Sequence, residues 1–195
     1  MAAVAVTGDI GAGKSTVSKL IAERLKCPLI DADKITAELW HDENVKEIFV
    51  SCWGNGILSP SGEIIKSEIS RRIFFDIDEY KFCNSVLHPL VMKELKNRSK
   101  EFENIVLEIP LLFEACEERP GWINKIIYVA ADFEVRAERC QAQRGWSPYE
   151  LKRRESFLMP RDKKISMSDF VIHNDGSLEE LKETLQPFLQ RIAVA

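Results

Sequence analysis

The chain has 195 residues, 45% of them hydrophobic, which suffices for one compact α/β domain with a sizeable buried core. Its net charge of −4 argues against a general nucleic-acid-binding protein, because such proteins carry a basic surplus that displaces counterions from phosphates. The five scattered cysteines lack zinc-site spacing, and no apolar run reaches the ~20 residues of a membrane-spanning helix, so we expect a cytoplasmic protein.

The first predicted elements are a strand, a loop and a helix. Residues 2–6 form a short apolar run, glycines follow, and residues 16–26 carry apolar side chains at helical spacing. Further short apolar runs predict strands at residues 28–31, 105–109, 126–129 and 170–172. Helical patterns occupy approximately residues 34–52, 66–99, 133–144 and 177–191. This alternation predicts a three-layer α/β/α fold with a five-stranded parallel sheet.

The spacing of these elements also predicts how the chain is divided within its single domain. More than 70 residues separate the second strand from the third, which exceeds what a simple crossover needs. We expect a helical acceptor-binding insertion at about 33–102 and a lid at about 136–164. The core then comprises residues 1–32, 103–135 and 165–195.

A phosphate-binding loop is predicted between the first strand and the first helix. Residues 8–15 match the pattern G-x-x-x-x-G-K-[ST] in the strand–loop–helix context that the pattern requires. Glycines let backbone N–H groups surround a phosphate, and the helix N-terminus adds unpaired donors. Lys14 is expected to bridge the β- and γ-phosphates of a nucleoside triphosphate, and the Ser15 hydroxyl to bind Mg²⁺. The alternative is a structural glycine turn with a capping serine.

Other P-loop classes fit less well. A GTPase needs a guanine-reading Asn-Lys-x-Asp motif, but Asn124 and Lys125 precede a predicted strand and no aspartate follows them. A motor or helicase ATPase needs a larger core. A small-molecule kinase with an acceptor subdomain and a basic lid remains.

Two aspartates follow the second predicted strand. Asp31 and Asp33 lie at the carboxyl edge of the sheet, where ligands bind in such folds. We expect Asp33 to orient the acceptor hydroxyl or take its proton. The alternative for either residue is a helix N-cap.

The predicted lid is basic. Residues 136–164 hold nine lysines and arginines against four acidic residues, although the whole chain is negative. Such a segment can fold over a triphosphate and neutralise its charge. Arg139 and Arg144 are the expected contacts, whereas for most of the other basic residues taken singly a solvated helix face is the favoured interpretation.

Together, these stretches resemble the dephospho-CoA kinase family. The resemblance rests on the P-loop, on Asp31-Ala32-Asp33, on Leu87-His88-Pro89-Leu90, on residues 109–114 (Ile-Pro-Leu-Leu-Phe-Glu), on Arg139 with Arg144, and on residues 168–176. It implies phosphorylation of the 3′-hydroxyl of the dephospho-CoA ribose by ATP and Mg²⁺, with Asp33, Lys14 and Arg139 as catalytic residues.

The resemblance also implies binding residues. For ATP they are Gly11, Ala12, Gly13, Lys14, Ser15, Thr16, Arg139, Arg144 and Asn174. For the acceptor they are Asp33, His88, Pro89, Pro110, Leu111, Leu112 and Glu114. On the residues alone, the alternative for His88 and Pro89 is a helix cap and a helix start, and that for Asn174 is a strand-ending turn.

Three positions depart from the family pattern. Asp9 replaces a common glycine, and unless it points outward its carboxylate is expected to repel ATP. Leu158 stands where glutamine is common and is given no role. Glu108 replaces an aspartate, for which a water-mediated contact to Mg²⁺ is considered.

Two other functions stay open from the sequence. One is a P-loop kinase acting on a nucleoside, nucleotide or shikimate-like acceptor, and the other is a nucleotide-binding protein without catalysis. A monomer is expected, because no exposed heptad or apolar face stands out.

Overall fold

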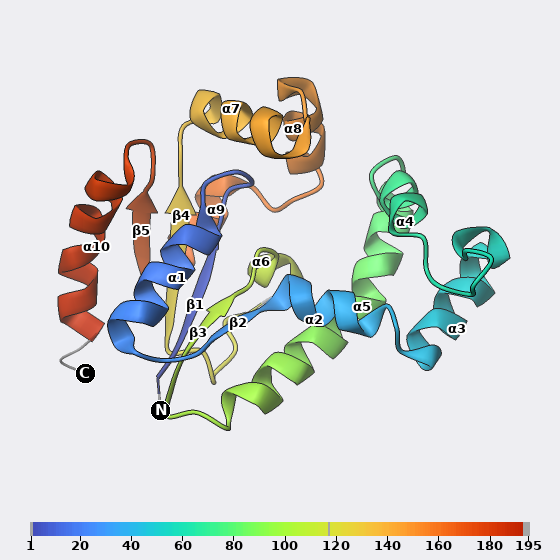
Figure 1. Cartoon of the computed structure of the whole chain (residues 1–195), viewed down its shortest axis with the longest axis horizontal. Coiled ribbons are helices and arrows are strands. Elements are labelled where there is room, and N and C mark those ends of the chain that lie inside the picture. Colours follow the sequence, from blue (N-terminus) through green and yellow to red (C-terminus); the bar gives the residue numbers. More distant parts are fainter. Residues whose placement is uncertain (1, 117, 193–195) are drawn as a thin grey trace.

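The computed structural model describes residues 2–116 and 118–192, and within them a parallel β-sheet lies between two groups of helices (Figure 1). The strands are β1 (Ala2–Gly8), β2 (Leu29–Asp31), β3 (Asn104–Glu108), β4 (Lys125–Ala130) and β5 (Phe170–His173). Their order is β2-β3-β1-β4-β5, and every pairing is parallel. The predicted five-stranded parallel sheet is confirmed, with each strand end within two residues of its expected position.

The central strand β1 is buried on both faces of the sheet. Ala3 and Ala5 belong to one hydrophobic cluster and Val4 and Val6 to the other, and none of the four is more than 1% exposed. Helices α1 (Lys14–Leu25) and α10 (Leu178–Ile192) cover the Val4 face. Continuous apolar runs are typical of such doubly covered strands, which is why the sequence located them well.

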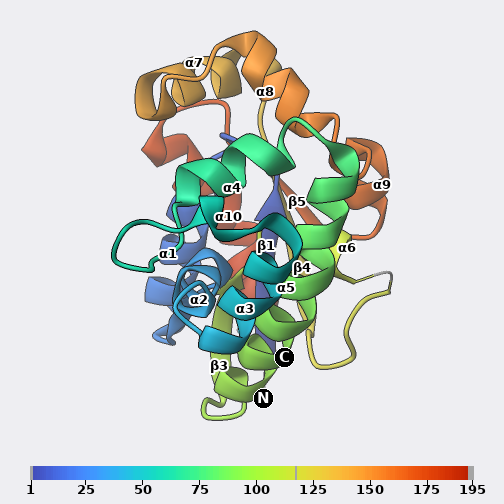
Figure 2. The ribbon, with the colours of Figure 1, turned by 90° about the vertical axis from the view of Figure 1, so that its right-hand side faces the viewer.

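The insertion between β2 and β3 has a hydrophobic core of its own. It contains α2 (Ala32–Leu39), α3 (Glu43–Trp53), the 3₁₀ turn η1 (Asn55–Ile57), α4 (Lys66–Ile73) and α5 (Ile77–Ser99). Trp40, Phe49 and Trp53 pack together there, with neighbouring ring centroids 4.8 Å apart. Figure 2 looks onto this insertion, with α3, α4 and α5 in front of the sheet.

Both long helices predicted in the insertion are interrupted. The carboxylates of Asp42 and Asp76 each accept hydrogen bonds from the backbone N–H groups two and three residues further along the chain, and so begin α3 and α5. Aspartate favours such caps over helix interiors, which explains the breaks. The alternative of a helix start at Pro89 is wrong, because Pro89 lies inside α5.

The segment predicted as a lid lies beyond the carboxyl ends of the strands (Figure 1). It contains α7 (Phe133–Arg144), which was predicted, and α8 (Pro148–Glu155) and α9 (Arg161–Ser166), which were not. The short α6 (Leu112–Ala115) follows β3 and was also missed. Across residues 2–116 and 118–192, no helix has the length and apolar character needed to cross a membrane.

Candidate active site

The P-loop connects β1 to α1 in a shape that only glycine adopts easily. Gly8, Gly11 and Gly13 have φ values of 144°, 78° and 87°. A Cβ atom on Gly8 would lie 2.1 Å from the Val129 carbonyl oxygen, and one on Gly13 would lie 2.4 Å from Nδ2 of Asn174. The glycines therefore permit both the turn and the close approach of β4 and the β5–α10 connection.

Lys14 lies inside the curve of this loop. Its Nζ donates hydrogen bonds to the carbonyl oxygens of Gly8, at 3.3 Å, and Asp9, at 2.9 Å. Burial lowers the pKa of Lys14 to about 8, while the nearby Glu108 carboxylate opposes this shift. A phosphate would favour the charged ammonium, so the loop presents a cation that gains by binding an anion.

Ser15 and Glu108 form an oxygen pair beside the loop. The Ser15 hydroxyl donates to Oε1 of Glu108 at 2.6 Å, and Glu108 ends β3 almost fully buried. Burial raises the pKa of Glu108, and the Ser15 hydrogen bond acts in the opposite direction. A hydroxyl and a carboxylate suit Mg²⁺, which prefers few protein oxygens plus substrate phosphates. Among the described residues, no group of three or more His, Cys, Asp or Glu side chains is arranged to hold a metal ion.

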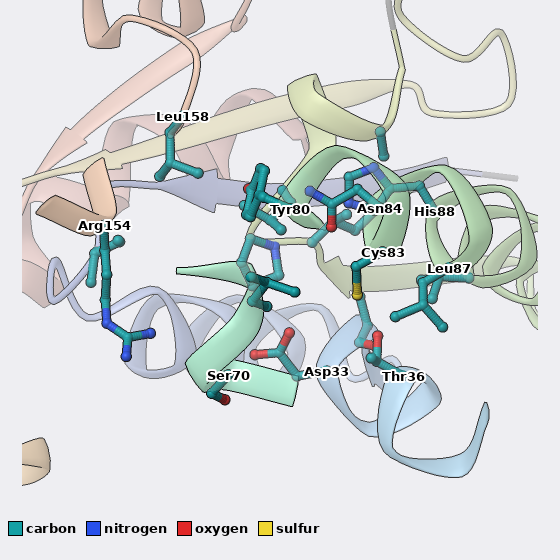
Figure 3. Close-up of a pocket in the computed structure, with 18 of the residues that line it drawn as sticks. Asp33, Thr36, Ser70, Tyr80, Cys83, Asn84, Leu87, His88, Arg154 and Leu158 are labelled. Carbon is teal, nitrogen blue, oxygen red and sulfur yellow. The ribbon is translucent and has the colours of Figure 1, made fainter. Parts of the chain in front are cut away.

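Asp31 and Asp33 have different roles in the structure. Oδ1 of Asp31 accepts a hydrogen bond from the Asp33 backbone N–H at 2.9 Å, so Asp31 is the N-cap of α2. The N-cap alternative for Asp33 is therefore wrong. Its side chain opens into a cavity that Lys14 also lines (Figure 3). Withdrawal from bulk water and the adjacent Asp31 charge raise the pKa of Asp33, against the influence of Lys14 and Arg144.

This cavity has a volume of about 380 Å³ and lies between the P-loop, the insertion and the lid. Apolar side chains from the end of α2, from α4 and α5, and from the segment after β3 line it, namely Trp40, Ile69, Ile73, Leu87, Ile109 and Leu111. Lys14 and Asp33 line the same cavity and are its candidate reactive groups. A ligand with an apolar, flat portion and a reacting hydroxyl matches this combination.

A polar ridge on α5 forms another side of the cavity. Tyr80, Asn84 and His88 follow one another at four-residue spacing and line the same space (Figure 3). Tyr80 Oη and His88 Nε2 are buried without a hydrogen-bond partner among the described residues. Burial also lowers the pKa of His88, which favours the neutral ring. Unpaired buried polar atoms are costly, so these groups are suited to a bound molecule.

The segment after β3 divides between the cavity and the core. Pro110 and Leu111 line the cavity, and the Pro110 carbonyl oxygen accepts a hydrogen bond from Thr7. Leu112, by contrast, is 1% exposed within the hydrophobic core and does not reach the cavity. Its side chain points inward because α6 begins there and packs against the sheet.

Glu114 and Pro89 lie at an adjoining cavity on the other side of α5. Oε1 of Glu114 is 2.7 Å from Nζ of Lys164, and it accepts a hydrogen bond from the Met159 backbone N–H at 3.1 Å. Both charged side chains are nearly buried. The pair therefore joins α6 to the segment that ends the lid.

The lid places two arginines near the main cavity. The guanidinium carbon of Arg144 lies 4.8 Å from the centroid of the Trp146 ring. The positive charge of Arg144 acts to lower the pKa of both Lys14 and Asp33. Arg154 stacks at 3.9 Å over Trp146 and lines the cavity (Figure 3). Sequence reasoning missed Arg154, because nothing distinguished it from the other basic residues of the lid.

Arg139 and Asn174 meet behind the P-loop. Arg139 donates to the Asn174 carbonyl oxygen at 2.8 Å, and the Asn174 amide donates to the Ala12 carbonyl oxygen at 2.7 Å. Neither residue lines the cavity that contains Lys14 and Asp33. The two residues therefore connect α7 and β5 to the phosphate loop.

Comparison with known proteins identifies the family. The family model described as dephospho-CoA kinase matches residues 2–180. The chain belongs to the dephospho-CoA kinase family. The dephospho-CoA kinase of Carboxydothermus hydrogenoformans is 33% identical over 194 residues, covering 96% of this chain and 93% of that protein. The resemblance seen in the sequence is thus confirmed.

Solved structures agree with membership of the dephospho-CoA kinase family. A crystal structure from Thermus thermophilus has a TM-score of 0.76 and 31% identity, covering 98% of this chain and 97% of that one. The dephospho-CoA kinase of Campylobacter jejuni has a TM-score of 0.64 and 25% identity, covering 97% and 96%. The P-loop α/β fold predicted from the sequence is confirmed.

Asn174 offers a test of the P-loop support in this dephospho-CoA kinase family member. Asn174→Ala leaves the buried Ala12 carbonyl oxygen unpaired, and we expect the free energy of unfolding to fall by about 1–3 kcal/mol. Urea denaturation measures this change, with the exposed Asn97→Ala as the matched control. Equal stability of the two variants would contradict the supporting role.

Proposed function

We propose that this chain transfers the γ-phosphoryl group of ATP to the 3′-hydroxyl of the dephospho-CoA ribose, giving coenzyme A and ADP. Membership of the family supports this reaction. The observation that carries it is the common cavity of Lys14 and Asp33, beside the oxygen pair of Ser15 and Glu108. A phosphate site and a carboxylate for a hydroxyl acceptor are thereby held together.

In the proposed reaction, the acceptor oxygen attacks the γ-phosphorus and the bond to the bridging β,γ-oxygen breaks. Asp33 orients the hydroxyl and takes its proton, a role for which a raised pKa is favourable. Lys14, with Arg139 and Arg144 from the lid, stabilises the triphosphate and the charge that develops on ADP. The backbone of residues 11–16 surrounds the phosphates.

The proposed acceptor site is the main cavity together with the adjoining one. The purine base of the acceptor nucleoside suits the apolar wall, and the polar ridge of Tyr80, Asn84 and His88 can satisfy its hydrogen-bonding edge. Pro110 and Leu111 complete the main cavity, and Pro89 and Glu114 lie where the rest of the acceptor leaves it. Leu112 contributes through the core that supports this wall.

We propose that Ser15 and Glu108 hold Mg²⁺, which neutralises β- and γ-phosphate charge when bound. Glu108→Gln keeps the size of the side chain but removes its charge. We expect the Mg²⁺ concentration for half-maximal activity to rise about tenfold. A magnesium titration at fixed ATP measures this, with the exposed Glu103→Gln as control. An unchanged midpoint would exclude Glu108 from the metal site.

The test of the function is ATP-dependent formation of coenzyme A from dephospho-CoA, run beside shikimate, nucleosides and nucleoside monophosphates. Turnover of one of the other acceptors without dephospho-CoA would favour a different P-loop kinase. ATP binding without any turnover would favour a catalytically silent protein. One chain supplies the P-loop, Asp33 and the lid, so we also propose that the protein is a monomer. Light scattering of the purified protein measures its molar mass and tests this proposal. We further propose that the protein is cytoplasmic.

A further inference from the structure

Asp9, the second residue of the P-loop, has an unusual environment for a carboxylate next to a phosphate site. Its side chain is 5% exposed, and Oδ2 lies 3.1 Å from Nε of Arg161 and 3.9 Å from Nε of Arg136. Oδ1 accepts a hydrogen bond from the Tyr128 hydroxyl, and Oδ2 accepts one from the Ala131 backbone N–H. Two guanidinium groups and two further donors therefore surround this one carboxylate.

The Asp9 side chain does not line the cavity that contains Lys14. It lines a separate small cavity with Tyr128, Arg136 and Arg161, on the side of β4 and the lid ends. Burial, together with the hydrogen bond to this carboxylate and its charge, raises the pKa of Tyr128 and keeps the phenol protonated as a donor. The repulsion of ATP expected from the sequence depends on an unneutralised charge, and here the charge is paired.

The backbone of Asp9 connects this cluster to the phosphate site. Its carbonyl oxygen accepts the 2.9 Å hydrogen bond from Nζ of Lys14. Arg136 also donates to the neighbouring carbonyl oxygen of Ile10 at 3.3 Å. A movement of the Asp9 side chain therefore changes both the P-loop backbone and the position of the Lys14 ammonium.

Residues at the beginning and at the end of the lid both contact the Asp9 carboxylate. Arg136 lies in the first half of α7, where the lid begins, and also pairs with Glu155 of α8. Arg161 is the first residue of α9, where the lid ends. Since both guanidinium groups reach the Asp9 carboxylate, one side chain links the P-loop to the two segments that carry the lid arginines.

We propose that Asp9 is a positioning residue for ATP. Its carboxylate fixes the P-loop and seats both ends of the lid, so the negative charge at this position strengthens ATP binding instead of weakening it. The proposal rests on ATP as the donor in the proposed function, and it does not depend on the identity of the acceptor. If Asp9 simply repelled ATP, removal of its charge would strengthen ATP binding, whereas this proposal expects removal of the charge to weaken it.

Asp9→Asn provides the direct test, because asparagine preserves the shape and removes the charge. We expect the Kd of a non-hydrolysable ATP analogue with Mg²⁺, measured by calorimetry, to rise about tenfold. The KM for ATP should rise in parallel, while the KM for the acceptor stays within about twofold. An unchanged or lower Kd would overturn the proposal. Because binding is read without an acceptor, a failed kinase assay leaves this result interpretable.

Arg161 gives a second route that tolerates substitution, since its side chain is 42% exposed. Arg161→Gln is expected to raise the same Kd several-fold, and Arg161→Lys to restore most of the affinity. Combining Arg161→Gln with Asp9→Asn should add little beyond the larger single effect, because both remove one interaction. The matched control is Arg71→Gln, whose side chain is 63% exposed and pairs with Glu68 of its own helix. The proposal would be overturned if the double variant raised the Kd by the product of the two single effects, or if Arg161→Gln left the Kd unchanged.

Discussion

Lys14→Ala is expected to lower kcat/KM for ATP by about a thousandfold. The ammonium group is the charge that the P-loop directs at the phosphates, and the carbonyl oxygens of Gly8 and Asp9 hold it in place. An alanine leaves those carbonyl oxygens facing the phosphates with no cation between them. Loss in both kcat and affinity is expected, since the contact strengthens as charge develops on the leaving group.

Steady-state kinetics with ATP varied at saturating acceptor measures this effect. Lys19→Ala is the matched control, because Lys19 is an exposed lysine of the same helix α1 and lies beyond the first turn that follows the P-loop. The control is expected to keep kcat/KM within about twofold. A loss below about tenfold for Lys14→Ala would contradict the role of Lys14 in phosphoryl transfer.

The P-loop and the sheet were predictable because their signals are local. Glycine spacing around Lys14 and short apolar runs are determined by neighbouring residues, and both patterns report backbone requirements directly. Helix boundaries were less accurate. Asp42 and Asp76 begin new helices through their own side chains, but each lies within a pattern of helical periodicity that continues across it.

One missed helix had a local signal. Ser147 caps α8 by accepting a hydrogen bond from the Glu150 backbone N–H, and Pro148 occupies its first turn. Serine followed by proline is a helix-start signal, although helical periodicity is too short to be recognised over the eight residues that follow. The short α6 and α9 carry no comparable pattern, since a few residues are too short to show periodicity.

The cavity itself was the least predictable part of the site. Tyr80, Asn84 and Arg154 come from α5 and α8, and only tertiary packing brings them next to Asp33. The direction of the Asp9 side chain was equally inaccessible, because its partners Tyr128 and Arg161 are far from it in sequence. Sequence patterns indicate the backbone conformation of a short segment. The cavity and the Asp9 contacts depend instead on which side chains, distant in sequence, come together in the folded protein.

Asp33→Asn is expected to lower kcat by about 10²–10⁴-fold while the KM for ATP stays within about twofold. Asparagine preserves the shape of the side chain in the cavity but cannot accept the hydroxyl proton. In the unmodified protein the raised pKa of Asp33 implies that kcat/KM for the acceptor declines as the pH falls through that pKa. This decline at low pH, the acid limb of the pH–rate profile, should be absent from the residual activity of Asp33→Asn.

Asp31→Asn is the matched control for Asp33, since asparagine caps a helix about as well as aspartate and leaves α2 intact. Asp31 raises the pKa of Asp33 through its negative charge, so its removal lowers that pKa and moves the acid limb to lower pH. Plateau activity should stay within about threefold. If Asp33→Asn kept full activity, or if both variants lost activity equally without a shift of the limb, Asp33 would not be the group that receives the proton.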